Sequence, residues 1–386
     1  MKTMLKIIIA ADSFKGSAGA PFVVAHLAYG VRRLLPDAEI VELPLSDGGE
    51  GMLDAYLRTG GARFTIPVTG PDGRTADADY GILPDGTAVI EMAQASGLTL
   101  VPEARRDALS ATTYGTGELI RAALDRGCRS LLIGIGGSAT NDGGAGMACA
   151  LGARFLDGDG RPLPPGGAAL RRLSRIDASG LDPRLAACHV TVACDVTNPL
   201  CGPNGASAVY GPQKGVHTEQ IALLDEALSH YGALLAAQLG KDVAACPGAG
   251  AAGGLGAALL AFCGAVIRPG IETVLDALHF EEALDGACLV LTGEGRIDAQ
   301  SACGKVPVGV ARRVKRLDAS IPVVAVVGSI STGAELVYRE GVDAIMPLPS
   351  RPMTLEESMQ NPGPLLEDAA ERALRLLLAG RALRPR

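Results

Sequence analysis

The chain has 386 residues, of which 48% are hydrophobic, and it carries a formal net charge of -7. This length suggests about two domains with sizeable cores, and the acidic balance argues against nucleic acid as the main partner, because phosphate backbones select basic surfaces. The nine cysteines include no C-x-x-C pair, which is typical of a reducing cytosol. Since the first residues also do not match a signal peptide, a cytoplasmic protein is expected.

The first elements predicted along the chain are a strand, a helix and a second strand. Residues 6–12, KIIIAAD, form a continuous apolar run typical of a strand buried on both faces. Residues 21–35 have helical spacing, with Pro21 suited to a first turn, and residues 38–45 predict the second strand. The last third repeats this order, with strands expected at 288–293, 321–328 and 342–348 and helices at 303–317, 331–341 and 362–380.

The two chain ends therefore supply five strands with helical crossovers, the number in a flavodoxin-like open parallel sheet. The middle differs, since residues 73–93 alternate in short runs that favour antiparallel pairing. We predict two α/β domains: residues 1–72 plus 270–386 as the flavodoxin-like parallel-sheet domain, and residues 73–269 as an inserted mixed α/β domain.

One uncharged run, residues 246–267, has the length of a membrane span. Its first half is mostly glycine and alanine around Pro247, which favours a loop that leads into a buried helix. We therefore expect no membrane association.

Each of five clusters of glycine and polar residues follows a predicted strand. They are DSFKGS (12–17), SDGGEG (46–51), GIGGSATNDGG (134–144), CDVTNPLCGPNG (194–205) and TGEGRIDAQS (292–301). Ligands of open α/β sheets bind beyond the carboxyl ends of the strands. We therefore expect one large site, in the cleft between the two domains.

Acidic residues of these loops form the stronger chemical pattern, and basic residues lie among them. The acids are Asp12, Asp47, Glu50, Asp142, Asp195, Glu294 and Asp298, and the bases are Lys15, Lys214, Arg296 and Lys305. Single acids of this kind often only cap helices or close turns. Together they suit metal-assisted phosphoryl transfer, in which carboxylates hold Mg²⁺ or accept a proton and lysines neutralise the phosphate.

Roles within this pattern follow from position. Asp47 and Glu50, paired in one glycine turn, are predicted to bind Mg²⁺. Asp195 ends an apolar strand and precedes a loop with two prolines, which suits a general base that accepts a hydroxyl proton. Asp142 is its main rival for that role. Lys15 is expected to contact a phosphate or a substrate carboxylate.

Two stretches also match dinucleotide-binding fingerprints. Gly134, Gly136 and Ala139 give G-x-G-x-x-A, and residues 248–253 give G-x-G-x-x-G. Asp142 would repel a pyrophosphate at the first of them, which counts against dinucleotide binding. A nicotinamide-dependent oxidoreductase of a small hydroxy acid is therefore kept only as the alternative. A non-catalytic ligand sensor is disfavoured because no DNA-binding or partner module is appended.

Several long motifs occur in one order almost from end to end. DSFKGS, DGGEG, GIGGSATNDGGAG, ACDVTNPLCGPNGAS, GPQKG, GAGAAGGLGAAL and TGEGRID together resemble the bacterial glycerate kinases of the type-1 family. The resemblance implies ATP-dependent phosphorylation of D-glycerate with Mg²⁺, usually at the 2-hydroxyl to give 2-phosphoglycerate. Transfer to the 3-hydroxyl, giving 3-phosphoglycerate, stays open, as does the oligomeric state.

If the chain has the activity that the resemblance implies, the candidate residues fall into four groups by role. The catalytic candidates are Lys15, Asp142 and Asp195. The residues expected to bind glycerate are Asp12, Ser13, Ser138, Asn141, Asn198 and Arg296. Those expected to bind ATP or its phosphates are Gly136, Gly137, Lys214, Gly250, Gly253, Gly254, Glu294 and Lys305. The expected Mg²⁺ ligands are Asp47, Glu50 and Asp298.

Overall fold

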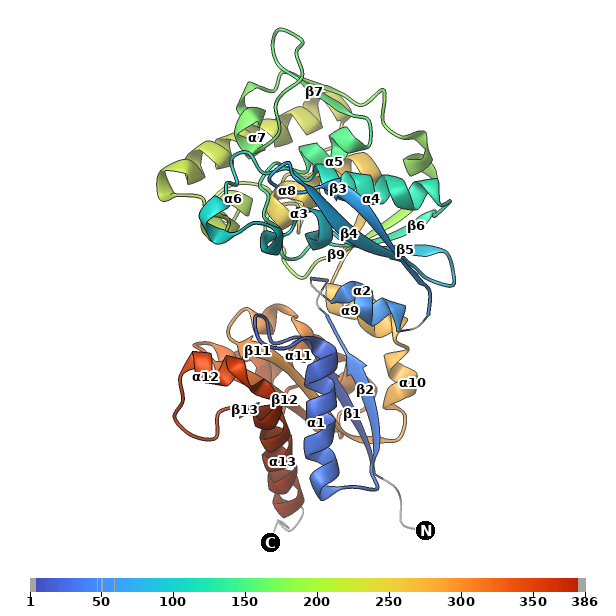
Figure 1. Cartoon of the computed structure of the whole chain (residues 1–386), viewed down its shortest axis with the longest axis vertical. Helices are drawn as coiled ribbons and strands as arrows, with labels where there is room; N and C mark the ends of the chain where they lie inside the picture. The colour runs from blue at the N-terminus through green and yellow to red at the C-terminus, as the bar shows by residue number, and fades with distance from the viewer. Residues whose placement is uncertain (1–4, 47, 50, 59, 381–386) are drawn as a thin grey trace. The chain divides into compact units, whose positions relative to one another are not determined.

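The computed structural model describes residues 5–46, 48–49, 51–58 and 60–380, without the side chain of Cys303. These residues form two compact units, each with its own sheet (Figure 1). Unit 1 comprises residues 1–47 and 271–386, and unit 2 comprises residues 48–270. The protein is therefore an α/β protein in which a second sheet is built from the middle of the chain.

Unit 1 contains a parallel sheet made by both ends of the chain, as predicted. Its strand order is β2-β1-β11-β12-β13, and every neighbouring pair is parallel. The strands are β1 (Lys6–Ala11), β2 (Glu39–Pro44), β11 (Ala287–Ile297), β12 (Val323–Ile330) and β13 (Ala344–Pro347). The helices are α1 (Ala20–Leu34), α9 (Gly270–Ala277), α10 (Phe280–Leu284), α11 (Val306–Leu317), α12 (Leu355–Gln360) and α13 (Pro362–Gly380), with 3-10 turns η6 (Ser301–Cys303) and η7 (Ala334–Glu340).

Strand β1 is buried on both faces, which explains its continuous apolar run. Ile7 and Ile9 pack into a core with α1 and α13, which lie side by side (Figure 1). Ile8 points the opposite way and is fully buried as well, and α11 contacts β1, β11 and β12. The helix expected at residues 331–341 is a 3-10 helix, η7.

A buried arginine joins three helices of unit 1. Arg313 of α11 is 8% exposed at its side chain and donates to Glu272 at 3.1 Å and to Asp276 at 2.7 Å. It also forms an ion pair with Glu281 of α10. These charge-assisted bonds fix α9 and α10 against α11.

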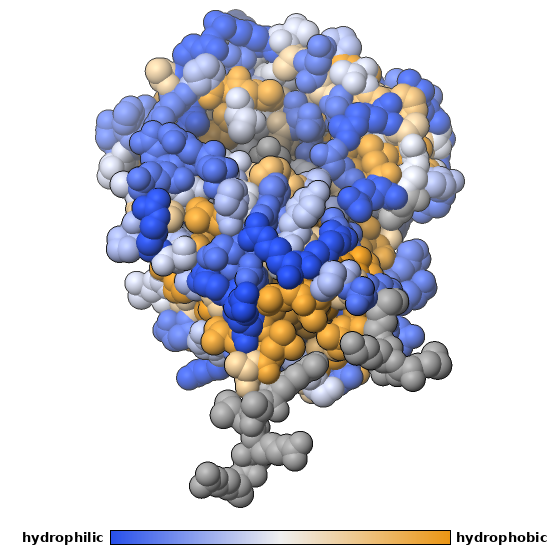
Figure 2. Space-filling view, turned by 60° about the horizontal axis from the view of Figure 1, so that its bottom comes forward, coloured by the Kyte–Doolittle hydropathy of each residue, from blue (hydrophilic) through white to orange (hydrophobic). Residues whose placement is uncertain are grey.

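An apolar surface lies at the amino-terminal end of this sheet (Figure 2). It surrounds a hollow of about 380 Å³ whose walls include Leu5, Leu35, Leu374 and Leu376. Leu376, on α13, is 66% exposed.

Unit 2 is built on a mixed sheet of order β10-β9-β6-β5-β4-β3. The strands β3, β4 and β5 pair antiparallel, as the alternating pattern of residues 73–93 predicts, whereas β5, β6, β9 and β10 are parallel. These strands are β3 (Ala62–Thr69), β4 (Thr75–Ile82), β5 (Thr87–Glu91), β6 (Ser130–Gly134), β9 (His189–Ala193) and β10 (Val266–Arg268), beside a small hairpin of β7 (Arg154–Leu156) and β8 (Arg175–Asp177). The helices are α2 (Met52–Leu57), α3 (Ala93–Ser96), α4 (Tyr114–Asp125), α5 (Ala145–Ala150), α6 (Ala206–Tyr210), α7 (Thr218–Leu239) and α8 (Ala251–Cys263).

The first boundary between the units differs from the expected one. Residues 48–72 belong to unit 2, because β3 pairs with β4 along its whole length, from Ala62 opposite Ile82 to Thr69 opposite Thr75. The sequence pattern changes near residue 72 because the turn of this hairpin lies there, and not because a border between units does. The second boundary, expected at 269/270, lies at 270/271.

The uncharged run of residues 246–267 is a mostly buried part of unit 2. It holds α8, which is kinked at Ala252, Gly253 and Gly254, followed by β10. Over the described residues, none of the helices combines the length and the apolar character that a membrane crossing needs.

Candidate functional site

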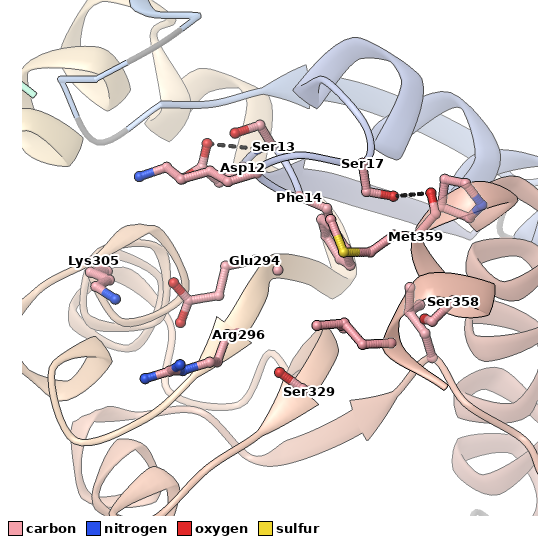
Figure 3. Close-up of a pocket in the computed structure, with 16 residues that line it drawn as sticks. Asp12, Ser13, Phe14, Ser17, Glu294, Arg296, Lys305, Ser329, Ser358 and Met359 are labelled. Atoms are coloured by element: carbon pink, nitrogen blue, oxygen red, sulfur yellow. Dashed lines mark hydrogen bonds between the residues drawn. The ribbon is translucent and has the colours of Figure 1, made fainter. Parts of the chain in front are cut away.

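A hollow of about 400 Å³ lies at the carboxyl ends of the strands of unit 1 (Figure 3). Strand β1 lies between β2 and β11, so successive chain connections run in opposite directions from it. Open α/β sheets bind their ligands at such a switch point. The residues that line the hollow are Asp12, Ser13, Phe14, Lys15, Ser17, Glu294, Gly295, Arg296, Lys305, Gly328, Ser329, Leu348, Leu355, Ser358, Met359 and Pro362.

The loop after β1 is closed by its own backbone. Phe14 N donates to Ala18 O at 2.7 Å, and Ala18 N donates back to Phe14 O at 2.9 Å. Asp12 is 6% exposed, and its Oδ1 accepts from Ser13 N at 2.6 Å. Lys15 lies at the exposed tip of this loop, where its ammonium group can reach a ligand in the hollow.

Glu294 and Arg296, at the carboxyl end of β11, share one side of the hollow with Lys305, which lies just before α11 (Figure 3). Asp298 Oδ2 accepts from the Arg296 guanidinium at 3.2 Å, and its Oδ1 lies 3.9 Å from Lys305 Nζ. Burial alone would raise the pKa of Asp298, but the charge of Lys305 and hydrogen bonds from Gln300 and Arg296 lower it below its ordinary value. Glu294, 6% exposed, accepts from the Ser301 hydroxyl.

In unit 2, Asp142 lies inside the protein. It is 1% exposed and accepts from Thr113 N at 2.8 Å, Gly144 N at 3.0 Å and Gly146 N at 3.1 Å, besides the Thr113 hydroxyl. Burial raises the pKa of Asp142, against these hydrogen bonds. The carboxylate therefore organises the start of α5.

Lys214 is buried beside the same loop. It is 1% exposed, and its Nζ donates to Thr140 O at 2.7 Å. Burial lowers the pKa of Lys214 to about 7, against the opposing charge of Asp142. Asn141 is fully buried, and its Nδ2 donates to Ser207 Oγ at 2.9 Å. This geometry suits an internal support for the loop better than contact with a phosphate.

Four of the glycines expected at phosphates lie against the chain's own backbone. A Cβ on Gly136 would lie 2.7 Å from Gly49 Cα. On Gly250, Gly253 and Gly254, a Cβ would lie 2.1 Å from Pro199 O, 2.0 Å from Thr140 O and 2.7 Å from Gly143 Cα. Their missing side chains thus permit close packing of loops, and the two fingerprint stretches are used for internal packing. Gly137 is exposed.

The remaining candidates of unit 2 lie near the ends of its parallel strands. Asp195 is partly exposed after β9, and its Oδ1 accepts from Gly270 N at 2.8 Å. Asn198 donates to Asn204 O at 2.8 Å and accepts from the Tyr210 hydroxyl at 2.7 Å.

Ser138 is 7% exposed, and its backbone forms an isolated antiparallel β-bridge with Gly97. A hollow of about 220 Å³ beside Ala139 includes Arg105 and Arg106, two arginines that the sequence patterns did not single out.

Two of the expected metal ligands, Asp47 and Glu50, lie outside the described residues. Within those residues, no group of three or more histidine, cysteine or acidic side chains is arranged to hold a metal ion.

The sequence patterns also missed one wall of the unit 1 hollow. It is formed by Leu348, Leu355, Met359 and Pro362, which belong to a segment without glycine clusters. The only available signal was the spacing of Leu355, Ser358 and Met359, which places three residues on one side of a short helix.

Known proteins resemble this chain over nearly its whole length. The model of the glycerate kinase family matches residues 7–378. Glycerate 2-kinase of Escherichia coli strain K12 is 50% identical over 358 residues, which cover 92% of this chain and 93% of that protein. Glycerate kinase of Halalkalibacterium halodurans is 49% identical over 369 residues, covering 95% and 97%.

A solved structure agrees with these relatives. The crystal structure of a Salmonella typhimurium LT2 protein described as a glycerate kinase 2 has a TM-score of 0.83 and 50% identity, and the match covers 99% of this chain and 100% of that one. Because a family model, close relatives and a solved structure all match over nearly the full chain, this chain belongs to the glycerate kinase family.

Proposed function

We propose that this chain transfers the γ-phosphoryl group of ATP to the 2-hydroxyl of D-glycerate. A relative at 50% identity is named glycerate 2-kinase. The observation that carries the proposal is the unit 1 hollow, where Lys15, Arg296 and Lys305 line one cavity with two acids. Phosphoryl transfer depends mainly on positioning and on neutralising the charge of the phosphate oxygens.

The three cations are proposed to hold the phosphates. Lys15 extends from a closed loop, and the Arg296 side chain is 66% exposed, so both can turn to a ligand without disturbing the core. Asp298 lies next to Arg296 and Lys305 and keeps them at the hollow. We therefore assign Asp298 to positioning these cations rather than to binding a metal ion.

The residues present fit a magnesium ion brought in with the nucleotide. Mg²⁺ in kinases is held by one or two carboxylates together with phosphate oxygens, and Asp12 and Glu294 offer carboxylates in one hollow with the serine hydroxyls of Ser13 and Ser329. We propose Asp12 and Glu294 as its ligands, with Asp47 and Glu50 as further candidates from sequence. When bound, the ion neutralises charge on the transferred group.

Glycerate is proposed to bind beside these groups. The guanidinium of Arg296 has five N–H donors, so it can pair with the glycerate carboxylate as well as with a phosphate oxygen, and Ser13 can donate to or accept from the glycerate hydroxyls. Asn141 and Asn198 already make bonds within unit 2, so we assign them to supporting its loops. Ser138 stays a candidate at the edge of unit 2.

Asp195 is proposed as the general base. As a residue it is partly exposed at the carboxyl end of β9, although its Oδ2 is buried, whereas Asp142 is 1% exposed and accepts hydrogen bonds at both of its oxygens. A base must reach the hydroxyl from which it takes the proton. This difference in access supports Asp195 over Asp142.

We also propose a flavodoxin-like topology for unit 1 and a cytoplasmic location for the protein. The strand order of unit 1, read as 2-1-3-4-5 along its own strands, supports a flavodoxin-like sheet. A cytoplasmic protein with small-molecule substrates and no nucleic-acid partner remains our expectation.

The proposal is tested by supplying the full-length protein with ATP, Mg²⁺ and D-glycerate. ADP release is followed by a coupled assay, and the product is offered to enolase without phosphoglycerate mutase. Immediate formation of phosphoenolpyruvate is expected, because enolase dehydrates only the 2-phosphate. If ADP is released but phosphoenolpyruvate appears only after mutase is added, the acceptor is the 3-hydroxyl. No glycerate-dependent ADP release would refute the proposed reaction.

A further inference from the structure

The unit 1 hollow has two chemically different sides. In Figure 3, Glu294, Arg296 and Lys305 lie on one side, and Phe14, Ser358 and Met359 lie on the other. Glycerate is a three-carbon acid whose oxygens all seek polar partners. It can use the charged side but leaves the apolar side without a matching group.

We infer that the apolar side binds the purine ring of the nucleotide, so that ATP lies across this hollow with its phosphates at Lys15, Arg296 and Lys305. This inference rests on the proposed kinase reaction and adds where the base of the nucleotide binds. A volume of about 400 Å³ is within the range of sites that bind small organic ligands. Apolar walls with a few hydroxyls are typical of such sites.

The apolar wall is a built surface rather than a frayed segment. Helix α12 begins with a capping box, in which Glu357 N donates to Thr354 Oγ1 at 3.1 Å and Thr354 N donates to Glu357 Oε2 at 2.7 Å. The helix is also tied to the loop of Lys15, since Ser17 Oγ donates to Met359 O at 2.8 Å. The apolar wall and the cationic loop are therefore held in a fixed relation.

Leu355 is the clearest sign of a missing partner on this wall. It is 71% exposed, yet it lines the hollow with Leu348 and Met359. A flat aromatic ring placed on these side chains would bury apolar surface that the fold alone leaves in water. The hydroxyls of Ser329 and Ser358, which line the same hollow, can bond the ring nitrogens or the ribose.

The test compares ADP with inorganic pyrophosphate as ligands of the whole protein, without glycerate, by calorimetry. The variant is Leu355→Ser, which removes apolar contact and adds no charge. The control is Leu376→Ser, because Leu376 is similarly exposed, at 66%, but lines a different hollow of unit 1. Thermal melting shows that both variants keep the wild-type fold.

We expect the wild type to bind ADP more tightly than pyrophosphate. Leu355→Ser is expected to weaken ADP binding and to raise the KM for ATP about tenfold, with pyrophosphate binding and the KM for glycerate changed by less than about twofold. Leu376→Ser should leave all four values unchanged.

The inference is overturned if the wild type binds pyrophosphate as tightly as ADP, or if Leu355→Ser leaves ADP binding intact. It is also overturned if that variant raises the KM for glycerate instead. Each of these results is distinct from a failure of the proposed reaction, which would show as no glycerate-dependent ADP release by the wild type.

Discussion

Replacing Asp142 and Asp195 by asparagine separates a structural carboxylate from a catalytic one. Asparagine keeps the shape of aspartate but has one acceptor oxygen in place of two. We expect Asp142→Asn to lose stability and keep much of its turnover, and Asp195→Asn to keep stability and lose its turnover. The two variants therefore fail in opposite ways.

The size of the stability loss follows from the donors that face Asp142. Thr113 N and Gly146 N donate to one oxygen, and Gly144 N donates to the other. The amide oxygen of asparagine can serve one side only, so at least one buried N–H faces an NH₂ group. A buried donor left without its acceptor costs about 2 kcal/mol, which lowers the melting temperature of a unit of this size by about 4–8 °C.

Asp195 faces a smaller demand. Its Oδ1 accepts from Gly270 N, and the amide oxygen of asparagine can keep this bond, so the free energy of unfolding should fall by less than in Asp142→Asn. If Asp195 takes the hydroxyl proton, its amide variant should lose turnover by about a hundredfold or more while still binding both substrates.

Thermal melting and the coupled ADP assay at 25 °C, where both variants are folded, check these values. Near-normal turnover in Asp195→Asn would remove it from the role of base. Wild-type melting in Asp142→Asn together with lost turnover would refute the reasoning and move the proton transfer to Asp142.

Three further changes test other parts of the structure. Lys15→Ala should lower turnover by about a hundredfold or more and leave the melting temperature nearly unchanged, because an exposed lysine contributes little to folding; a large loss of melting temperature with normal turnover would show a structural role instead. Arg313→Leu should cost about 2–3 kcal/mol in urea unfolding, less than the 3–5 kcal/mol of a fully buried pair, since its carboxylate partners are 28–46% exposed; an unchanged unfolding free energy would contradict this. Burial lowers the pKa of Lys214 in the folded protein to about 7, from 10.5. Between these two pH values the folded protein binds fewer protons at Lys214 than the unfolded chain does, so the free energy of unfolding should rise by about 2 kcal/mol from pH 7 to pH 9. Lys214→Met should flatten that rise, and a rise of equal size in the variant would assign it to other groups.

Much of the fold could be predicted because the pattern of apolar residues indicates which strands are buried. The apolar run of β1 predicted a strand buried on both faces, and α13 begins and ends where its helical pattern does, at Pro362 and Gly380. The boundary near residue 72 was less predictable. A hairpin turn and a border between units share the same glycine, proline and aspartate residues, and only the pairing of β3 with β4 distinguishes them.

The candidate site was predictable in part for a similar reason. Asp12 and Lys15 follow β1, and Arg296 lies at the carboxyl end of the neighbouring strand β11, so their closeness follows from the topology of the parallel sheet. Leu355 could not be found in this way, because it lies on a helix far along the chain and its exposure is visible only in three dimensions.

The sequence of a glycine-rich loop does not identify what approaches its backbone. A glycine reports that something comes within contact distance of the backbone, but not what comes there. At Gly253 a close neighbour is Thr140 O, and at Gly136 it is Gly49, so loop packing by itself accounts for glycine at both positions. The buried Asp142 and Lys214 have the same explanation, since loops packed this tightly need internal acceptors and donors for their backbone groups. Motifs of this kind can therefore serve the packing of the loop itself, and we seek the residues that meet the ligand where charge lines an open cavity, as it does at Lys15, Arg296 and Lys305.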